Sequence, residues 1–148
     1  MTASSTILEA AECALDYAIQ EQAFIDHSHI PLIVHQTWRN LEPETWNDVS
    51  RRCAEAWLRI ATGDGPAEDP TMAYFLWDDD GISQLMEHYE PEILQNFELL
   101  PYPVTKADVF RVTVLKWFGG VVCFLAELFT LLISLTQSHS MPTWTRDR

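Results

Sequence analysis

The sequence predicts an α/β domain built on a mainly parallel sheet, and three observations support that prediction. Short apolar runs rich in β-branched and aromatic residues alternate with longer segments of helical periodicity. The resulting order of strand, helix, strand, helix and strand is typical of parallel sheets covered by helices. The 148 residues, 47% hydrophobic and 11% aromatic, provide enough apolar material for one modest core.

The first two predicted elements are a helix and a buried strand. From Ile7 to Phe24, apolar residues recur at helical spacing with acidic residues between them, which indicates an amphipathic helix. After Pro31, the run LIVHQTW is β-branched and aromatic and therefore predicts a strand.

The middle of the chain predicts a second helix, a loop and a second strand. Over about Glu44 to Ala61, large apolar residues recur every three or four positions along one face. The glycine- and proline-rich stretch TGDGPAEDP predicts a loop, and MAYFLW predicts a strand closed by the acidic turn DDDG. Two short helices are expected around Ile82–Tyr89 and Glu92–Glu98.

The last predicted helix covers Lys106–Phe118 and leads back into the sheet. Thr105 and Asp108 form a T-x-x-D pattern, which predicts a capping box at the start of this helix. Gly119–Gly120 are expected to end the helix, and Val121 is expected to open a third strand.

Composition excludes several classes of protein and site. The formal net charge of −13 makes a surface that tracks nucleic-acid phosphates improbable. No basic residue precedes Arg39, so the start lacks the positive region of a secretory signal. The apolar run Val121–Leu135, interrupted by Glu127, is too short for a convincing transmembrane span.

The spacing of the three cysteines matches neither a zinc site nor a disulfide framework. Buried free thiols are therefore expected at Cys13, Cys53 and Cys123.

Polar residues at the ends of the first two strands are candidates for ligand binding, because ligands of open α/β sheets sit beyond the carboxyl ends of the strands. His35 can stack on a flat base, while Gln36 and Thr37 can hydrogen-bond one. The alternative is that each is a strand-end residue with a satisfied hydrogen bond. Asp78–Asp80 contain a literal D-x-D, but a turn or an N-cap ahead of the Ile82 helix explains them better.

Asp108 and Arg111 are a second candidate pair. They are three residues apart and so share one helix face, where a carboxylate and a guanidinium can grip sugar hydroxyls. The alternative is a helix cap plus a surface ion pair, which contributes less than about 1 kcal/mol.

Four motifs in order resemble the glycosyltransferases of family 32, which include the fungal initiation-specific α-1,6-mannosyltransferases. They are IPLIVHQTW, a Trp-rich helix, YFLWDDD and YPVTKADVFRVTVLKWFGGV, and together they cover Ile30 to Val121. The resemblance implies a GT-A-like, Rossmann-like nucleotide-sugar-binding fold, a donor such as GDP-mannose, Mn²⁺, a glycan or glycolipid acceptor and a Golgi location. It also implies that the donor base is lined by His35, Gln36 and Thr37, and that the donor sugar is contacted by Asp108 and Arg111.

The sequence departs from this family after Val121. Family members continue into Gly-Gly-Val-Tyr-Ala-Asp-Val-Asp, whose D-x-D carboxylates hold the metal, whereas this chain continues VCFLAELFTLLISL. We therefore expect no metal-binding residue in this chain. The predicted division is an N-terminal helical extension at 1–29, the first part of a GT-A domain at 30–121 and an aberrant apolar tail at 122–148.

A translated intron from Val122 to Ser140 is our hypothesis for the departure. Val122-Cys123 can be encoded GTATGT, a common fungal 5′ splice site, and the intron length would shift the reading frame. Read in the other frame, the codons of the last residues can give Tyr-Ala-Asp-Val-Asp, the missing motif. Two alternatives remain: an authentic C-terminal element that covers the sheet, and a non-catalytic nucleotide-binding or interaction protein derived from the same fold.

Overall fold

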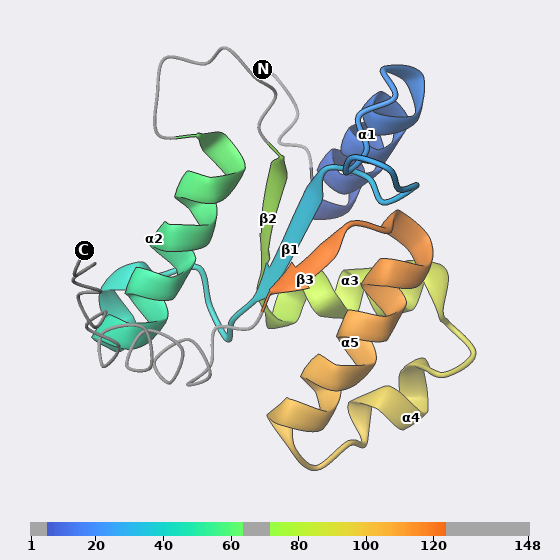
Figure 1. Cartoon of the computed structure of the whole chain (residues 1–148). Helices are drawn as coiled ribbons and strands as arrows, with labels where there is room; N and C mark the ends of the chain where they lie inside the picture. Colours follow the sequence, from blue (N-terminus) through green and yellow to red (C-terminus); the bar gives the residue numbers. More distant parts are fainter. Residues whose placement is uncertain (1–5, 64–71, 124–148) are drawn as a thin grey trace, which may run out of the picture.

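The computed structural model describes residues 6–63 and 72–123, which form a sheet of three parallel strands. Strands β1 (Ile33–Thr37), β2 (Ala73–Trp77) and β3 (Val121–Cys123) lie in the order β2-β1-β3, with β1 in the centre (Figure 1). The predicted α/β class with a parallel sheet is confirmed, and the arrangement is that of part of a Rossmann-like GT-A half-domain.

Helices cover both faces of the sheet. Helix α2, Asp48–Thr62, lies on one face (Figure 1). The other face carries α1 (Ile7–Gln20), α3 (Asp79–Tyr89) and α5 (Pro103–Phe118), with the short α4 (Leu94–Glu98) beside α5. The first crossover joins β1 to β2, and the second returns from β2 past β1 to β3, so the sheet has its topological switch point between β1 and β3.

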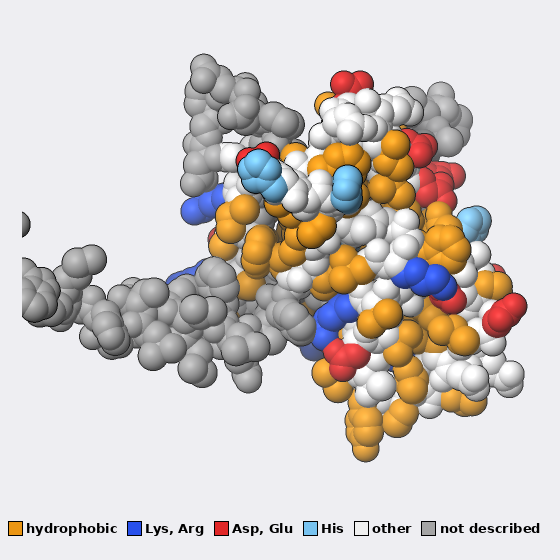
Figure 2. Space-filling model, turned by 45° about the vertical axis from the view of Figure 1, so that its right-hand side comes forward, with side chains coloured by type: hydrophobic (Ala, Val, Ile, Leu, Met, Phe, Trp, Pro, Cys, Tyr) orange, Lys and Arg blue, Asp and Glu red, His pale blue; other side chains and the backbone are white. Residues whose placement is uncertain are grey.

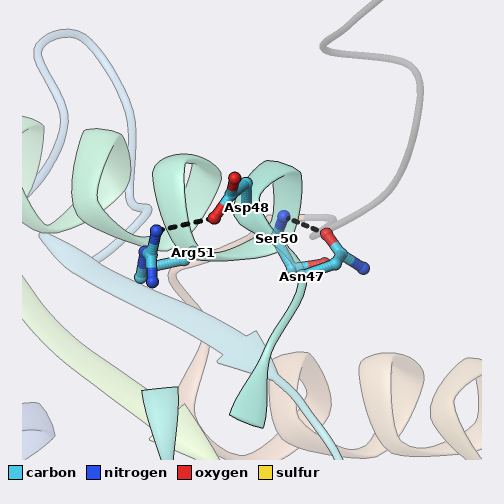
Figure 3. Close-up of polar contacts among 4 residues, drawn as sticks. All are labelled: Asn47, Asp48, Ser50 and Arg51. Carbon is cyan, nitrogen blue, oxygen red and sulfur yellow. Dashed lines mark hydrogen bonds and ion pairs between the residues drawn. The ribbon is translucent and has the colours of Figure 1, made fainter. Parts of the chain in front are cut away.

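The start of α2 is set by its own first residues. A 3-10 turn at Pro43–Thr45 leads to Asn47, whose side-chain oxygen accepts a hydrogen bond from the Ser50 N–H at 2.8 Å. One residue on, Asp48 pairs with Arg51 at 2.7 Å on the solvent side of the first turn (Figure 3). The predicted helix is confirmed, with its regular part beginning four residues later than expected.

Helix α1 is confirmed but ends before Phe24. It begins with a complete capping box, in which Thr6 and Glu9 satisfy each other's backbone N–H groups. It ends at Gln20 because Gln22 adopts a left-handed conformation, with φ of 57°, that turns the chain toward β1.

The acidic run after β2 opens α3. Asp78 caps the helix by accepting a hydrogen bond from the Gly81 N–H at 2.9 Å, so the N-cap interpretation of DDDG is confirmed. The helix starts at Asp79 rather than at Ile82, because carboxylates are stabilised in the first turn by the helix dipole.

The predicted capping box at Thr105 is wrong. Helix α5 begins three residues earlier, with Tyr102 at the N-cap and Pro103 in the first turn, and no side chain caps it. The fixed φ of proline suits the first helical position, so Pro103 starts the helix instead of breaking the chain. Asp108 is therefore inside the helix, where it pairs with Arg111.

The larger part of the core lies between the sheet and α1, α3 and α5. Trp77, Phe110 and Phe118 are fully buried there, and the Trp77 ring contacts the rings of both phenylalanines. Smaller clusters lie under α2, and they contain the buried thiols of Cys53 and Cys123. Cys13 is exposed, contrary to the expectation of three buried thiols, because it lies on the solvent side of α1.

None of the described helices is both long and apolar enough to cross a bilayer.

Two glycines let α5 return to the sheet. Gly119 ends the helix with φ of 65° and Gly120 follows with φ of 79°, so both adopt the left-handed region that glycine occupies without strain. A Cβ on Gly120 would lie 2.4 Å from the carbonyl oxygen of Ile33, at the start of β1. The close approach of these two backbones therefore requires glycine.

Gly120→Ala is expected to lower the free energy of unfolding by about 2 kcal/mol or more, since the added Cβ meets backbone and takes an unfavourable φ. Gly119→Ala is the graded comparison, because its Cβ would meet only the Pro31 side chain, at 3.0 Å. Urea unfolding followed by circular dichroism measures both. A loss at Gly119 equal to or larger than the loss at Gly120 would contradict this account.

Candidate functional site

A cavity of about 620 Å³ lies at the carboxyl edge of the sheet, beyond the end of β1. Its lining comes from the residues that follow β1, from the first turns of α3 and α5, and from the connection between α4 and α5. Ligands of open α/β sheets bind at this edge, next to the topological switch point. The volume is in the range of small-molecule sites.

One wall of the cavity is apolar. Trp38 contributes from the end of β1, and the other apolar groups are Ile82, Phe97, Leu100, Pro101, Pro103, Val104 and Ala107. The ring of Trp38 packs against Trp46 at a centroid distance of 5.7 Å, which holds it in place. Its Nε1–H is buried and has no hydrogen-bond acceptor among the described residues. The wall therefore offers a flat aromatic surface.

Positive charge gathers on the polar part of the lining. Arg39, Lys106 and Arg111 line the cavity, whereas Asp79 is the one carboxylate among the lining residues. The first turns of α3 and α5 also point their positive dipole ends toward it. In a chain of net charge −13, this local excess of cations favours an anionic ligand.

His35 belongs to β1, and its side chain lies in the core rather than in the cavity lining. It is fully buried, and its Nδ1 accepts a hydrogen bond from Trp77 Nε1–H at 3.1 Å. Its ring stacks on Phe75 with 5.9 Å between centroids. Burial lowers the pKa of His35 from 6.5 to about 4, against an opposing backbone interaction with Gly119, so the imidazole is neutral at pH 7.

Gln36 is buried on the opposite face, under α2. The Tyr74 hydroxyl donates a hydrogen bond to its side-chain oxygen. Burial raises the pKa of Tyr74 to about 12, with smaller contributions from Cys123 and Cys53, so the phenol stays protonated and remains a donor.

Two of the five predicted site residues line the cavity, namely Thr37 and Arg111. Asp108 adjoins it through its ion pair with Arg111; the Arg111 side chain is 22% exposed and that of Asp108 62% exposed. His35 and Gln36 are not brought to the cavity, and the structure contains no donor that would test any of the five roles. The roles remain predictions.

Sequence reasoning missed Trp38, Arg39 and Lys106 as lining residues. Trp38 and Arg39 directly follow the HQT motif, so their position just past a strand end was the available signal. Lys106 carried no such signal, because its place depends on how the first turn of α5 meets the end of β1.

No group of three or more His, Cys, Asp or Glu side chains gathers into a potential metal site within the described ranges 6–63 and 72–123. Asp78 is occupied as a helix cap. The described residues therefore do not fit the divalent metal that the family implies, and the tail that carries our splicing hypothesis lies largely outside them.

Residues 61–122 match the model of the family described as "Glycosyltransferase sugar-binding region containing DXD motif". The matched segment runs from the end of α2 to β3 and supplies the part of the cavity that comes from α3, α4 and α5. The resemblance to family 32 glycosyltransferases is confirmed.

Curated proteins that are similar to this chain include yeast proteins. Inositol phosphoceramide mannosyltransferase 3 of Schizosaccharomyces pombe is 30% identical over 93 residues, which is 62% of this chain and 23% of the relative. Mannosyl phosphorylinositol ceramide synthase SUR1 of Saccharomyces cerevisiae is 30% identical over 93 residues, or 62% and 21%. The chain thus spans less than a quarter of the length of these relatives. No solved structure matches it.

The buried His35 predicts a loss of stability in mild acid. Because its folded pKa is about 4 and the unfolded value is near 6.5, the unfolded chain takes up a proton that the folded chain excludes. The contribution of His35 is present above pH 6.5 and is lost as the pH falls toward 4, by up to about 3 kcal/mol. Urea unfolding at pH 7 and at pH 4.5 measures the change.

His35→Asn should be less sensitive to this change of pH, because the amide oxygen can still accept from Trp77 but does not titrate. The matched control is His27→Asn, at an exposed left-handed position with φ of 60° that asparagine tolerates. If wild-type protein and both variants lose the same stability between the two pH values, His35 is not responsible.

Proposed function

We propose that this chain carries the donor-binding half of a mannosyltransferase and that the cavity beside β1 binds a nucleoside diphosphate mannose, with GDP-mannose as the expected donor. The observation that supports this proposal is the composition of the cavity. An aromatic and aliphatic wall suits a base, and three cations together with the N-terminal turns of two helices suit a diphosphate.

Each lining group has a role in this proposal. Trp38 stacks on the base, and Thr37 hydrogen-bonds its edge. Arg39 and Lys106 bind the diphosphate as fixed positive charges. Asp108 and Arg111 contact the mannosyl hydroxyls, the carboxylate accepting and the guanidinium donating.

His35 and Gln36 act as positioning residues in the same proposal. Each is hydrogen-bonded to an aromatic side chain of β2, and Thr37 is the next residue of the strand after this pair. They hold the end of β1, and hence the base-binding residues, without touching the donor.

The acceptor that we propose is a phosphoinositol-headed sphingolipid in the Golgi membrane. The names of the yeast relatives describe mannosyl transfer to inositol phosphoceramide. A lipid acceptor also agrees with a donor cavity that opens beside exposed apolar residues, as described below.

The metal and the transfer step depend on carboxylates that the described residues do not supply. We propose that the D-x-D is restored by splicing out the codons for 122–140, and that Mn²⁺ on this pair offsets the charge of the departing diphosphate. The 148-residue chain would then bind the donor without transferring mannose.

Replacing cations of the lining should weaken nucleotide binding. Arg39→Met and Lys106→Met are each expected to lower the affinity for GDP by about tenfold, because each removes a charge-assisted hydrogen bond. Isothermal titration with GDP at fixed ionic strength measures the loss. The matched control is Arg51→Met, which removes a surface guanidinium on α2, away from the cavity.

Equal affinities in all three variants would contradict the assignment of the cavity. Binding of GDP that depends on Arg39 and Lys106, without mannosyl transfer even by the spliced product, would favour the alternative of a non-catalytic nucleotide-binding protein.

The splicing hypothesis predicts two messages and two activities. Transcript sequencing across the codons for Gly120 to Arg148 should reveal a junction that joins Val121 to Tyr-Ala-Asp-Val-Asp. With GDP-mannose, Mn²⁺ and inositol phosphoceramide, the spliced product should transfer mannose and the 148-residue chain should not. Transcripts that contain only the 148-residue reading frame would refute the hypothesis.

A further inference from the structure

The four most exposed large hydrophobic side chains of the described residues belong to one region of the fold. Leu99 is 74% exposed, Tyr102 65% and Val104 64%, and all three lie in the connection from α4 into α5; Val112, 71% exposed, lies two turns along α5. Figure 2 shows hydrophobic side chains protruding at the lower end of the molecule, where Figure 1 places this connection. We call Leu99, Tyr102 and Val104 the apolar tip.

The backbone of the tip is held rigidly, although its side chains project. Phe97 and Leu100 on either side of Leu99 pack into the core, and the Tyr102 carbonyl accepts hydrogen bonds from the N–H groups of Thr105 and Lys106. Pro101 and Pro103 restrict the chain further. The exposure is therefore built into the fold and is not a consequence of a loose loop.

The tip adjoins the cationic side of the cavity. Leu100, Pro101, Pro103 and Val104 line the cavity, so the tip forms part of its rim, and Lys106 follows two residues after Val104. The Lys106 ammonium lies 5.6 Å from the centroid of the Phe97 ring. The apolar side chains of the tip thus project outward, and the cation Lys106 lies next to them in the cavity lining.

This order matches the boundary of a lipid bilayer, where hydrocarbon lies beneath a layer of phosphate groups. Aliphatic side chains and tyrosine at an exposed turn partition into that boundary, with basic residues at the level of the phosphates. We propose that the apolar tip docks on a membrane surface and holds the mouth of the donor cavity against it. This inference rests on the proposed function, because the membrane would present a lipid acceptor to the bound donor.

Vesicle flotation tests the proposal with the 148-residue chain and phosphatidylcholine vesicles containing phosphatidylinositol. The triple variant Leu99→Ser, Tyr102→Ser and Val104→Ser is expected to reduce the fraction bound by about tenfold, since it removes the apolar surface of the tip. Serine is a favourable N-cap residue in place of Tyr102, so α5 should keep its start, which circular dichroism verifies.

The matched control replaces the same kinds of side chain elsewhere. Tyr17→Ser, Ile19→Ser and Ile60→Ser remove exposed side chains, 58%, 53% and 57% exposed, from α1 and α2. This control should stay within about twofold of the wild-type binding, since these residues do not adjoin the cavity. Equal losses in the two triples, or no loss in either, would overturn the proposal.

Two further results would also overturn it. Complete displacement by soluble inositol phosphate would assign binding to a head group in the cavity, and self-association lost only in the tip variant would assign the tip to a second copy of the chain.

GDP titration of the same variants separates the proposed nucleotide-binding function from the proposed docking surface. Tip-dependent flotation without GDP binding refutes only the proposed function, whereas GDP binding without tip-dependent flotation refutes only the docking surface.

Discussion

The structure depends on two buried polar side chains, His35 and Gln36, of its central strand β1. Helices pack on both faces of the sheet that contains this strand. Such strands are usually continuous apolar runs, and a buried amide or imidazole costs a few kcal/mol unless it is hydrogen-bonded. Trp77 donates to His35 Nδ1 on one face and Tyr74 donates to Gln36 Oε1 on the other, and both donors come from β2. The second nitrogen of each side chain, His35 Nε2 and Gln36 Nε2, is buried without a hydrogen-bond partner among the described residues. A one-residue slip between β1 and β2 would break both hydrogen bonds and would turn the side chains of the shifted strand to the opposite face of the sheet. The pair therefore fixes the register that places Thr37 at the cavity.

The position of α5 follows from the opposite end of the same strand. Gly120 fits against the Ile33 carbonyl, which joins the end of α5 to the start of β1. A helix of 16 residues is about 24 Å long, whereas the five residues of β1 extend about 17 Å. Because α5 runs back along the strand, its first turns must extend past the carboxyl edge of the sheet. That geometry carries Lys106 to the cavity and leaves the connection before Pro103 projecting from the molecule.

The sequence was sufficient for the fold class and for most elements, because periodicity and glycines report on local backbone and on burial. It failed at the start of α5, where a capping pattern at Thr105 competed with Pro103 and the proline prevailed. It placed His35 and Gln36 near a ligand because they follow an apolar run, but their side chains point sideways into the two layers of the core. The cavity lining begins only at the end of the strand, with Thr37, Trp38 and Arg39, and a position at or just past the strand end is the one local signal for these residues. Which cations meet there is a tertiary property, so Lys106 could not be found from its neighbours.

The acidic balance of the chain and the cationic lining of the cavity are compatible, and both agree with the nucleotide ligand that we propose. Charges beyond the screening length, about 8 Å at physiological ionic strength, act weakly on a bound anion, whereas Arg39, Lys106 and Arg111 act at contact. The surplus of carboxylates, −13 overall, repels a polyanion that would lie across the surface. A compact anion that enters a space of about 620 Å³ meets the cations and avoids most of that repulsion. An acidic chain with a small basic cavity is therefore unfavourable for nucleic acid and compatible with the single nucleotide that we propose as its ligand.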